Sequence, residues 1–380
     1  MKIGYLTKQN PEDKRAYSGI HFYMYKTLQQ QFEDVVPIGP VDTPFKYIPK
    51  ATGKIRRLIS GKIYKYQYNA ALCKRMAGII DKRIKETKPD AVLASLMTPE
   101  TAWLKTGTPI YLTSDATFPR LHELYSSHSN LHPKSIREAK ELEARAFSKA
   151  NTLIFPLKWI ADSAMNDYGV PSNKIEVIPY GANHDVSVAP ADVDEWIEQR
   201  STSMPLKLLF VGVRWEEKGG PFAVSVLNEL LQLGVDAELW VVGCRPEIKT
   251  HLKSDAIKIM GFLDKNRSRE MDELFRLYKE ASFFMMPTRA ECVGMSFIEA
   301  ASFGLPAIGS RTGGVPEAVH HKKTGFIIED HHSPQDVASW ILEVSNDKIG
   351  YERLSKSAFN HYSRNMNWRS WGEKVRQIIT

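Results

Sequence analysis

The chain has 380 residues, of which 43% are hydrophobic and 25% charged, a composition typical of a globular protein with two or three domains. Its three cysteines, Cys73, Cys244 and Cys292, are far apart and odd in number, which argues against a disulfide framework and against a zinc site. No apolar run approaches the ~20 residues that cross a membrane, and the first apolar run is too short for a signal peptide. We therefore expect a cytoplasmic protein, or one peripheral to the inner face of a membrane.

The net charge of +7 is concentrated in one segment. Residues 46–88 contain thirteen Lys and Arg against two acids, Asp81 and Glu86, so this segment carries +11 and the rest of the chain −4. The excess predicts an anionic partner: a lipid surface, an anionic acceptor or nucleic acid. The alternative is the solvated face of basic helices, since residues 62–86 are expected to form one long basic helix.

The first half of the chain alternates strand-like apolar runs with helical stretches. Strands are expected at residues 2–7, 34–39, 89–95, 109–113, 152–156 and 174–179, and helices at 18–32, 62–86 and 134–150. This alternation predicts a parallel sheet covered on both faces, which binds ligands beyond the carboxyl ends of its strands. Two features lie at such ends: Ser18-Gly19 after the first strand, and Asp115, which can also be a helix or turn cap.

Residues 190–205 are polar and acidic, and we place a domain boundary just before them. The alternation then begins again. Strands are expected at residues 206–212, 237–243, 257–261, 282–286, 306–310 and 324–328, with helices at 221–233, 269–280, 296–303, 336–366 and 367–378. The fold class is therefore α/β, with two halves of similar size.

The most informative stretch is residues 287–317. Glu291 and Glu299 are separated by seven residues, and Gly294 lies between them, where a loop should turn into a helix. A helix N-terminus presents unpaired N–H groups, glycine lets an anion approach them closely, and carboxylates can accept hydrogen bonds from sugar hydroxyls. The stretch thus predicts a site for a ligand with phosphate and polyol groups, such as a nucleotide sugar. An ordinary strand–loop–helix unit with two solvated glutamates is the alternative.

A second loop, residues 212–220, follows the strand expected at 206–212. Arg214 and Lys218 suit a diphosphate, because Arg grips two oxygens at once and Lys adds a compact charge. The loop is neither a Walker loop nor a GxGxxG fingerprint. Taken alone, it is equally explained by surface ion pairs with Glu216 or Glu217.

Together these two loops resemble a known family, the retaining GT-B glycosyltransferases of glycosyltransferase family four, group 1 type. The resemblance covers nearly the whole chain. It is strongest in PTRAECVGMSFIEAASFGLPAIGSRTGGVPEAV and FVGVRWEEKGG, and it includes SGIHFYMYKTL in the first half. It implies a GT-B fold, in which two Rossmann-like domains face each other across a cleft. The first domain would be residues 1–186, completed by the C-terminal helix 366–380, and the second would be residues 187–365.

The resemblance also implies roles for individual residues. The catalytic set would be Glu291, Asp115, Lys218 and Arg214. Glu291 would accept hydrogen bonds from the donor sugar, Asp115 would face the reacting sugar, and the two cations would neutralise the diphosphate. The donor-binding set would be Gly19, Gly212, Arg214, Lys218, Gly261, Phe262, Leu263, Glu291, Gly294, Met295, Ser296 and Glu299, the last on the ribose hydroxyls. Many members have Arg directly after the glycine of the loop, whereas Val213 intervenes here, so Lys218 is expected to matter more than Arg214.

The implied activity is metal-independent, retaining transfer of a sugar from a nucleotide-diphosphate sugar to a glycan or lipid-linked acceptor of cell-surface polysaccharide synthesis. No cofactor beyond the donor and no bound metal are expected. Residues 46–88 are expected to contact an anionic membrane, and nucleic acid is not expected as a partner. The last helix, with Trp368 and Trp371, should pack on the first domain. The alternatives are a nucleotide-sugar hydrolase or epimerase of the same fold, and a non-catalytic nucleic-acid- or lipid-binding protein.

Overall fold

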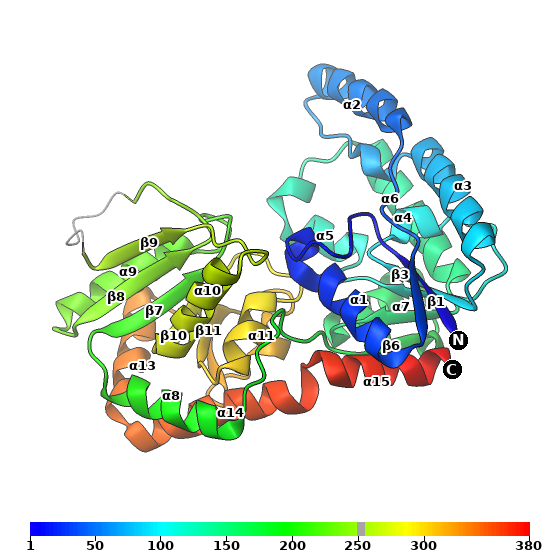
Figure 1. Cartoon of the computed structure of the whole chain (residues 1–380). Coiled ribbons are helices and arrows are strands. Elements are labelled where there is room, and N and C mark those ends of the chain that lie inside the picture. Colours follow the sequence, from blue (N-terminus) through cyan, green and yellow to red (C-terminus); the bar gives the residue numbers. More distant parts are fainter. Residues whose placement is uncertain (249–254) are drawn as a thin grey trace. The chain divides into compact units, whose positions relative to one another are not determined.

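The computed structural model describes residues 1–248 and 255–380 and divides into two compact units (Figure 1). The N-terminal unit comprises Met1–Tyr180 and Trp368–Thr380, and the C-terminal unit comprises Gly181–Asn367. These limits lie a few residues from those expected for the two domains. Each unit contains a six-stranded sheet in which all paired strands run parallel, so the α/β class is confirmed.

The N-terminal unit contains both the first and the last residues of the chain. Its elements are β1 (Lys2–Leu6), η1 (Ala16–Gly19), α1 (Ile20–Gln31), β2 (Asp34–Pro37), η2 (Pro44–Lys46), α2 (Tyr47–Ser60), η3 (Tyr66–Tyr68), α3 (Ala70–Thr87), β3 (Ala91–Ser95), α4 (Thr98–Thr101), β4 (Ile110–Thr113), α5 (Phe118–Leu124), η4 (Ser126–His128), α6 (Pro133–Lys149), β5 (Thr152–Phe155), α7 (Lys158–Tyr168), η5 (Ser172–Lys174), β6 (Ile175–Val177) and α15 (Trp368–Ile379).

The strand order in this unit is β2-β1-β3-β4-β5-β6. The order reverses between β1 and β3, and ligands of such sheets bind where it reverses. Helix α15 returns from the far end of the chain and packs on α1 (Figure 1). Trp368 stacks on Tyr23 and Tyr180, with ring centroids 6.4 and 5.7 Å apart, and Trp371 is fully buried. The prediction that the last helix packs on the first domain is confirmed.

The helix expected at residues 62–86 is shorter than predicted. Ile63 forms a bridge with Leu131, and α3 starts only after Asn69, whose side chain accepts a hydrogen bond from the Leu72 N–H at 3.0 Å. The bridge and this N-cap hold the chain before residue 70 out of helical geometry. The structure adds a basic helix that the sequence analysis did not assign, α2, just before this region.

The C-terminal unit has the same alternation. Its elements are α8 (Pro190–Thr202), β7 (Leu206–Val211), α9 (Gly220–Gln232), β8 (Ala237–Val242), β9 (Ile257–Gly261), α10 (Ser268–Glu280), β10 (Phe283–Met286), α11 (Met295–Ser302), β11 (Ala307–Ser310), α12 (Val315–Ala318), β12 (Gly325–Ile328), α13 (Pro334–Asn346) and α14 (Lys348–Asn365).

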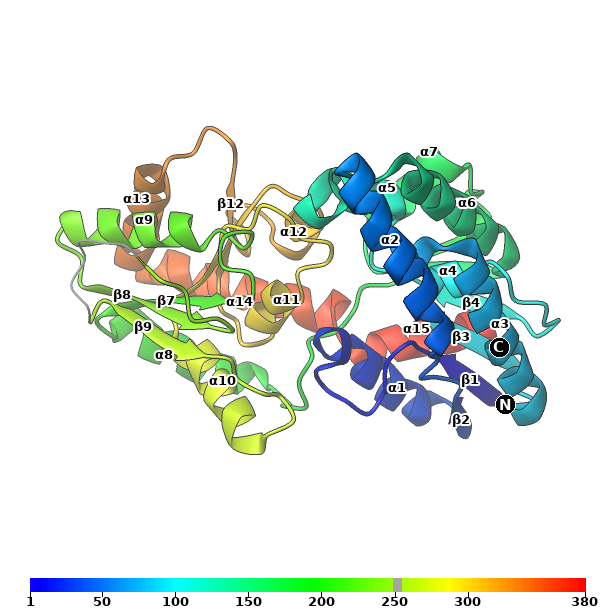
Figure 2. The same cartoon turned by 90° about the horizontal axis from the view of Figure 1, so that it is seen from above.

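The strand order in the C-terminal unit is β12-β11-β10-β7-β8-β9, which is the order of the Rossmann fold. The order reverses between β7 and β10, which pair directly through Phe283 with Leu208 and Phe284 with Leu209. Helices α9 and α13 pack together on one face of the sheet, and α8 and α10 lie on the other (Figure 2). The loops that follow β7 and β10 therefore leave the sheet side by side, at the place where such folds bind ligands.

The polar stretch 190–205, predicted to follow the domain boundary, belongs to the C-terminal unit, and most of it forms helix α8 (Pro190–Thr202). Arg200, only 2% exposed, fixes this helix by donating to the carbonyls of Lys279, Gly304, Tyr278 and Phe303 at 2.7 to 3.0 Å. A buried guanidinium satisfied by four carbonyls resists rearrangement, because moving it would leave a charge without partners. Within the described residues, no helix is long and apolar enough to cross a membrane.

Candidate active site

The two loops that the sequence analysis singled out are joined in the C-terminal unit. The Arg289 N–H donates to the Glu217 carbonyl at 2.8 Å. Gly219, with φ +79°, passes so close to the loop after β10 that a Cβ atom there would lie 1.8 Å from the Pro287 carbonyl oxygen. Only glycine fits this crossing. Loop 212–220 and loop 287–294 thus form one rigid surface at the carboxyl edge of the sheet.

Lys218 and Glu291 form the centre of this surface. The Lys218 ammonium donates to Glu291 Oε2 at 2.7 Å and to the Ala290 carbonyl at 3.0 Å. The two side chains are 13% and 15% exposed, so the ion pair is shielded but reaches the surface. The aliphatic stem of Lys218 passes over Gly212, where a Cβ would come within 3.2 Å of it. The structure therefore brings Gly212, Lys218 and Glu291 together, although the last two are 73 residues apart.

Gly294 ends this loop and begins helix α11 with φ +79°, a conformation that favours glycine. Its N–H donates to Glu291 Oε1 at 3.1 Å. Met295 and Ser296 form the first turn of the helix and are partly exposed. The first N–H groups of a helix have no partner within it, so this turn offers donors to an anion beside the Lys218–Glu291 pair. A carboxylate has about four acceptor positions, so Glu291 keeps capacity for ligand hydroxyls.

Glu299 lies about one turn further along α11 and is 4% exposed. Its carboxylate forms an ion pair with Lys265 and accepts a hydrogen bond from the Tyr278 hydroxyl at 3.1 Å. Burial and the nearby Glu299 charge raise the pKa of Tyr278 well above its usual value, so this hydroxyl stays a donor. The sequence analysis missed Lys265. The available signal was a lysine in the loop after β9, four residues beyond Gly261.

The ion pair between Lys265 and Glu299 ties the loop after β9 to helix α11. This loop contains the predicted backbone-binding residues Gly261, Phe262 and Leu263. Gly261 has φ +76°, and a Cβ there would meet the Arg245 guanidinium at 2.8 Å. Phe262 is 59% exposed, a large apolar side chain open to a ligand. The structure thus places the loop predicted to hold the base next to the glutamate predicted to bind the ribose.

Arg214 differs from Lys218. Its side chain is 53% exposed and forms an ion pair with Glu217 at 3.0 Å, three residues along the same loop. This is the surface ion pair that the sequence analysis weighed as an alternative, and such pairs contribute little to stability. Of the two cations, Lys218 is therefore the one held within the joined loops.

In the N-terminal unit, Gly19 is the N-cap of α1 with φ +94°. It ends a turn in which Tyr17 and Ser18 also have positive φ, 52° and 58°. Each non-glycine residue in this region costs about 1–2 kcal/mol, and such strain gathers at functional sites. This turn lies in the connection after β1, at the switch point of the N-terminal sheet. The sequence singled out Ser18-Gly19, but no sequence signal marks the positive φ of Tyr17 and Ser18, since Tyr and Ser rarely adopt this conformation.

His21 lies one turn into α1 and was not singled out from the sequence. It is 1% exposed, its Nδ1 is 3.2 Å from the Ser95 hydroxyl at the end of β3, and its ring is 5.5 Å from that of Tyr17. Burial lowers the pKa of His21 to about 4, so the ring is neutral at physiological pH. The neutral imidazole thus connects the strained turn with β3, and the Tyr5 hydroxyl of β1 donates to the His21 backbone carbonyl at 3.1 Å.

Asp115 follows β4 and is partly exposed. It lies near enough to Tyr180 and Tyr68 to add to the rise in their pKa values, although burial is the larger cause for both. Nearby, Glu143 is fully enclosed and accepts a hydrogen bond from the Phe118 N–H at 2.7 Å. Burial raises the pKa of Glu143 to about 7. Asp115 therefore stands at the edge of a buried acidic and phenolic cluster.

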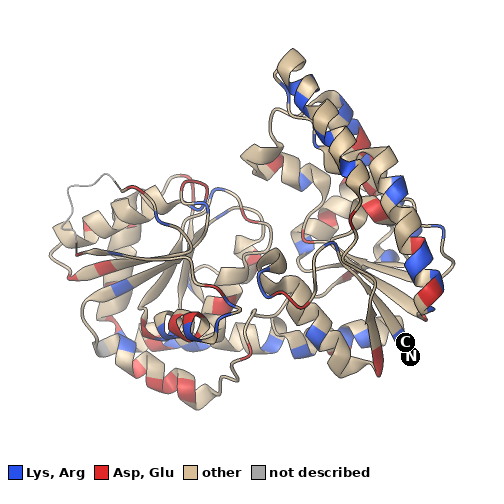
Figure 3. Cartoon of the chain, turned by 45° about the horizontal axis from the view of Figure 1, so that its top comes forward, with Lys and Arg blue, Asp and Glu red and all other residues tan. Residues whose placement is uncertain are grey.

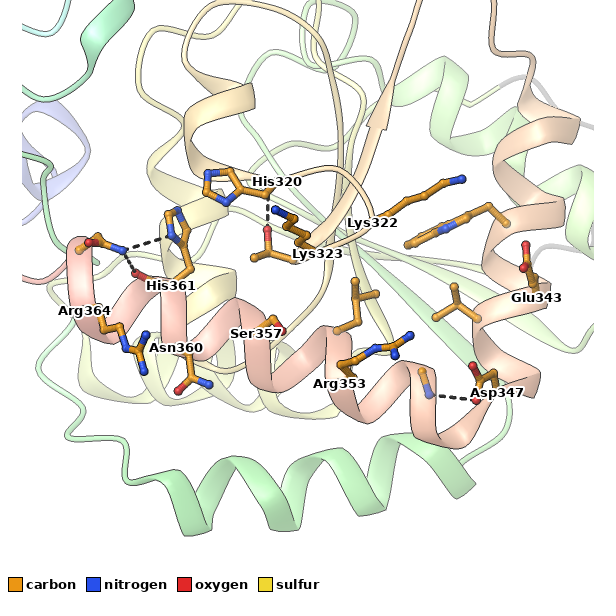
Figure 4. Close-up of a pocket in the computed structure, with 16 residues that line it drawn as sticks. His320, Lys322, Lys323, Glu343, Asp347, Arg353, Ser357, Asn360, His361 and Arg364 are labelled. Atoms are coloured by element: carbon orange, nitrogen blue, oxygen red, sulfur yellow. Dashed lines mark hydrogen bonds between the residues drawn. The ribbon is translucent and has the colours of Figure 1, made fainter.

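A groove of about 660 Å³ lies elsewhere in the C-terminal unit, along α13, α14 and the turn before β12 (Figure 4). Lys322, Lys323, Arg353 and Arg364 are among its lining residues. The predicted site residues are not, so the groove is separate from the joined loops. In residues 1–248 and 255–380, no group of three or more His, Cys, Asp or Glu side chains is arranged to hold a metal ion, and independence of metal stays a prediction.

Comparison with known proteins supports this architecture. The model of Glycosyltransferase Family 4 matches residues 30–186, and the model of Glycosyl transferases group 1 matches residues 205–347. The chain is 26% identical over 255 residues to D-inositol 3-phosphate glycosyltransferase of Corynebacterium glutamicum. This match covers 63% of the chain and spans 60% of the length of that relative.

Solved structures agree over the whole length. The chain is similar to WaaG, a glycosyltransferase involved in lipopolysaccharide biosynthesis, with a TM-score of 0.67, 14% identity, and coverage of 100% of this chain and 99% of that one. It is also similar to Anabaena Alr3699/HepE in complex with UDP-glucose, with a TM-score of 0.64, 15% identity and the same coverage. The two family models fall one on each unit, and the fold is GT-B. The chain therefore belongs to the group 1, family 4 glycosyltransferases.

Proposed function

We propose that this chain is a retaining glycosyltransferase that moves a sugar from a nucleotide-diphosphate sugar to an acceptor. The observation that carries the proposal is the Lys218–Glu291 pair at 2.7 Å beside the N-terminus of α11, at the switch point of the C-terminal sheet. A cation and free N–H groups suit a diphosphate, and a carboxylate with unused acceptor positions suits sugar hydroxyls. The three lie within one pair of joined loops.

The reaction breaks the bond between the anomeric carbon and the phosphate oxygen, and the electron pair stays on the diphosphate. Lys218 and the N–H groups of Met295 and Ser296 stabilise that growing negative charge, and one such donor typically contributes about 3–4 kcal/mol. The acceptor oxygen bonds to the anomeric carbon on the same face, and its proton passes to the leaving phosphate oxygen. Same-face attack retains the configuration of the donor sugar.

The remaining donor contacts follow from the loop after β9. Glu299 accepts hydrogen bonds from the ribose hydroxyls, and Lys265 is a positioning residue that holds this carboxylate in place through their ion pair. Backbone groups of Gly261, Phe262 and Leu263 hold the base. Arg214 adds charge near the diphosphate from a more exposed position.

The N-terminal unit supplies the acceptor side in this proposal. Gly19 admits the diphosphate close to the backbone of the strained turn, and Asp115 contacts the reacting sugar. The acceptor is a glycan or a lipid-linked sugar of cell-surface polysaccharide synthesis. The similarity to a glycosyltransferase involved in lipopolysaccharide biosynthesis supports this class, whereas another similar protein is named for D-inositol 3-phosphate. The protein works in the cytoplasm, and residues 46–88 contact an anionic membrane.

The test of this proposal is a screen of nucleoside diphosphates and their sugars by thermal shift, followed by product analysis. A ligand at 100 times its dissociation constant adds about 2.7 kcal/mol to the free energy of unfolding. One nucleoside diphosphate and its sugar should raise the melting temperature, without added divalent metal. If no nucleotide does so with or without metal, the proposal fails.

A nucleotide-sugar hydrolase or epimerase of the same fold remains the alternative. Incubation with the donor alone, followed by proton NMR, separates the reactions. Rapid release of free sugar at a rate unaffected by membrane acceptors would indicate a hydrolase, and a new sugar nucleotide would indicate an epimerase. Transfer to a lipid or glycan fraction with retained configuration is the expected result.

A further inference from the structure

Helix α2 packs on its own unit through Pro49 and Gly53, not through its large apolar residues. Among its residues only Pro49 and Gly53 are buried. A Cβ at Gly53 would lie 3.2 Å from the ring of Tyr64, so the backbone approaches that ring closely. The Arg56 guanidinium covers the same ring at 4.9 Å. Positions 49, 53 and 56 share one side of the helix, and this side faces η3 and its neighbours.

The large apolar residues of α2 point the other way. Leu58 and Ile59 are 86% and 82% exposed, and Tyr47, Ile48 and Ile55 are 61%, 58% and 55% exposed. Spacings of three, four and seven residues place them on one apolar stripe. A surface helix normally turns such a stripe toward the core. Here the stripe is exposed to solvent, on a helix that lies at the edge of the N-terminal unit (Figure 1). A contiguous exposed apolar stripe marks a site of interaction.

The charge around this stripe has one sign. No Asp or Glu occurs from residue 43 to residue 80, a segment with nine Lys and Arg. Figure 3 shows many Lys and Arg positions on the helices at the edge of the N-terminal unit, where α2 lies. Lys50, Lys54 and Arg57 flank the apolar stripe and are exposed, and none of them forms an ion pair with a carboxylate in the described parts of the chain.

We propose that α2 lies in the surface of an anionic bilayer, with Leu58, Ile59, Ile55 and Ile48 inserted among the acyl chains and Lys50, Lys54 and Arg57 at the phospholipid head groups. An apolar stripe beside basic residues is the pattern of interfacial helices. Nucleic acid or a free anionic acceptor would explain the charges but not the apolar stripe. A second copy would bring two sets of like charges together, which opposes association.

This inference makes the membrane contact of the proposed function more specific. It rests on that function only for its biological meaning. The proposed contact is then the insertion of one helix, α2, into the membrane, and not a general electrostatic attraction of residues 46–88 to it. Vesicle binding needs neither donor nor acceptor. Failure of the inference and failure of the proposed transfer reaction can therefore be told apart.

The first experiment is co-flotation of the full chain with vesicles of phosphatidylcholine alone, or with phosphatidylglycerol added. The wild type should bind the anionic vesicles. Leu58→Ser/Ile59→Ser should weaken binding about ten- to a hundredfold, because each buried methylene contributes to partitioning. Lys54→Gln/Arg57→Gln should weaken it about tenfold or more, and only on anionic vesicles.

The matched control is Ile349→Ser on helix α14, whose side chain is 77% exposed in the C-terminal unit. It removes an exposed apolar residue of the same kind outside α2, and vesicle binding should not change. The thermal shift with nucleotide should be the same for all these variants. Equal binding by the wild type and by Leu58→Ser/Ile59→Ser would overturn the inference.

The second experiment distinguishes insertion from adsorption. Leu58→Trp should give a blue-shifted fluorescence signal with anionic vesicles, and brominated acyl chains should quench it. Unshifted and unquenched emission would mean that the helix does not insert. Sedimentation would also overturn the inference if the wild type were a dimer and Leu58→Ser/Ile59→Ser a monomer, since the stripe would then be a self-association surface.

Discussion

The two units prepare their ligand sites in opposite ways. In the C-terminal unit, Lys218 with Glu291 and Lys265 with Glu299 are already paired, so charges and loops are fixed before any ligand arrives. In the N-terminal unit, the turn at residues 17–19 is strained, and helix α2 leaves its apolar side in solvent. Folding alone explains the first arrangement but not the second. Under the proposed function, the C-terminal unit is a rigid donor side, and the N-terminal unit is an acceptor side whose features need a partner.

The largest expected effect tests the donor side. Lys218→Met should lower the turnover of transfer about 10²–10³-fold, because it removes a preorganised cation from the leaving diphosphate. Arg214→Met should lower it no more than about tenfold, since that side chain is largely exposed and pairs with Glu217. Steady-state kinetics of both variants provide the measurement. Equal losses would mean that the two cations act alike and that the pairing of Lys218 has no special role.

Substitution of Glu299 should affect mainly nucleotide binding, and substitution of Glu291 should affect mainly turnover. Glu299→Ala should weaken the affinity for the nucleoside diphosphate about 10–100-fold, the effect of losing hydrogen bonds to a charged acceptor. Glu291→Ala should leave that affinity within about threefold and lower turnover instead. Calorimetric titration followed by kinetics checks both. The assignment would be wrong if the two variants lost nucleotide affinity equally.

Glu143 should contribute one of two opposing pH dependences to the stability of the N-terminal unit. Its pKa is raised from 4.5 to about 7, so the folded state binds the proton more tightly than the unfolded state. The contribution of Glu143 to the free energy of unfolding should therefore fall as pH rises from about 4.5 to 7, by at most about 3 kcal/mol. Glu143→Gln should remove this slope, measured as the free energy of unfolding against pH.

His21 provides the contrast within the same unit. Burial lowers its pKa from 6.5 to about 4, so the unfolded state binds the proton more tightly and stability rises with pH across that window. His21→Asn should remove this opposite slope. A variant at Glu143 that left the falling slope unchanged would show that another group carries it.

The smallest expected effect concerns the strained turn. Gly19→Ala should lower the free energy of unfolding by about 1–2 kcal/mol, because φ is +94° there. Gly78→Ala is the matched control: this glycine lies inside α3 with no atom within 4 Å of an added Cβ, and alanine should stabilise by up to about 1 kcal/mol. Donor binding should fall only in the first variant. Unchanged donor binding by Gly19→Ala would remove the turn from the site.

The sequence predicted most of the fold, because apolar runs alternate with helical stretches in both halves. It also predicted the Lys218–Glu291 loops, since both follow directly after buried strands and carry residue types with a clear chemistry. The ion pair of Lys265 with Glu299 and the contact of His21 with Ser95 were missed. They join residues 34 and 74 positions apart, and no local pattern marks such contacts.

Helix α2 was missed for a different reason. Its apolar residues have helical spacing. They lie among many charges and near Gly53, however, and these features favoured the interpretation of a basic surface segment. Only the structure shows that the helix packs through Pro49 and Gly53 and turns its large residues outward. The helix within the acidic stretch at 190–205 was also not assigned from the sequence, because the burial of Arg200 against four distant carbonyls is a tertiary effect.

The most direct test of the central claim is calorimetric titration of nucleoside diphosphates into the wild type and Lys218→Met. The account predicts that one nucleoside diphosphate binds the wild type, and that Lys218→Met weakens this binding about tenfold or more through loss of its contact with the diphosphate. The affinity for the corresponding nucleoside, which has no phosphate, should be the same for both proteins. An unchanged affinity of Lys218→Met for the diphosphate would contradict the account.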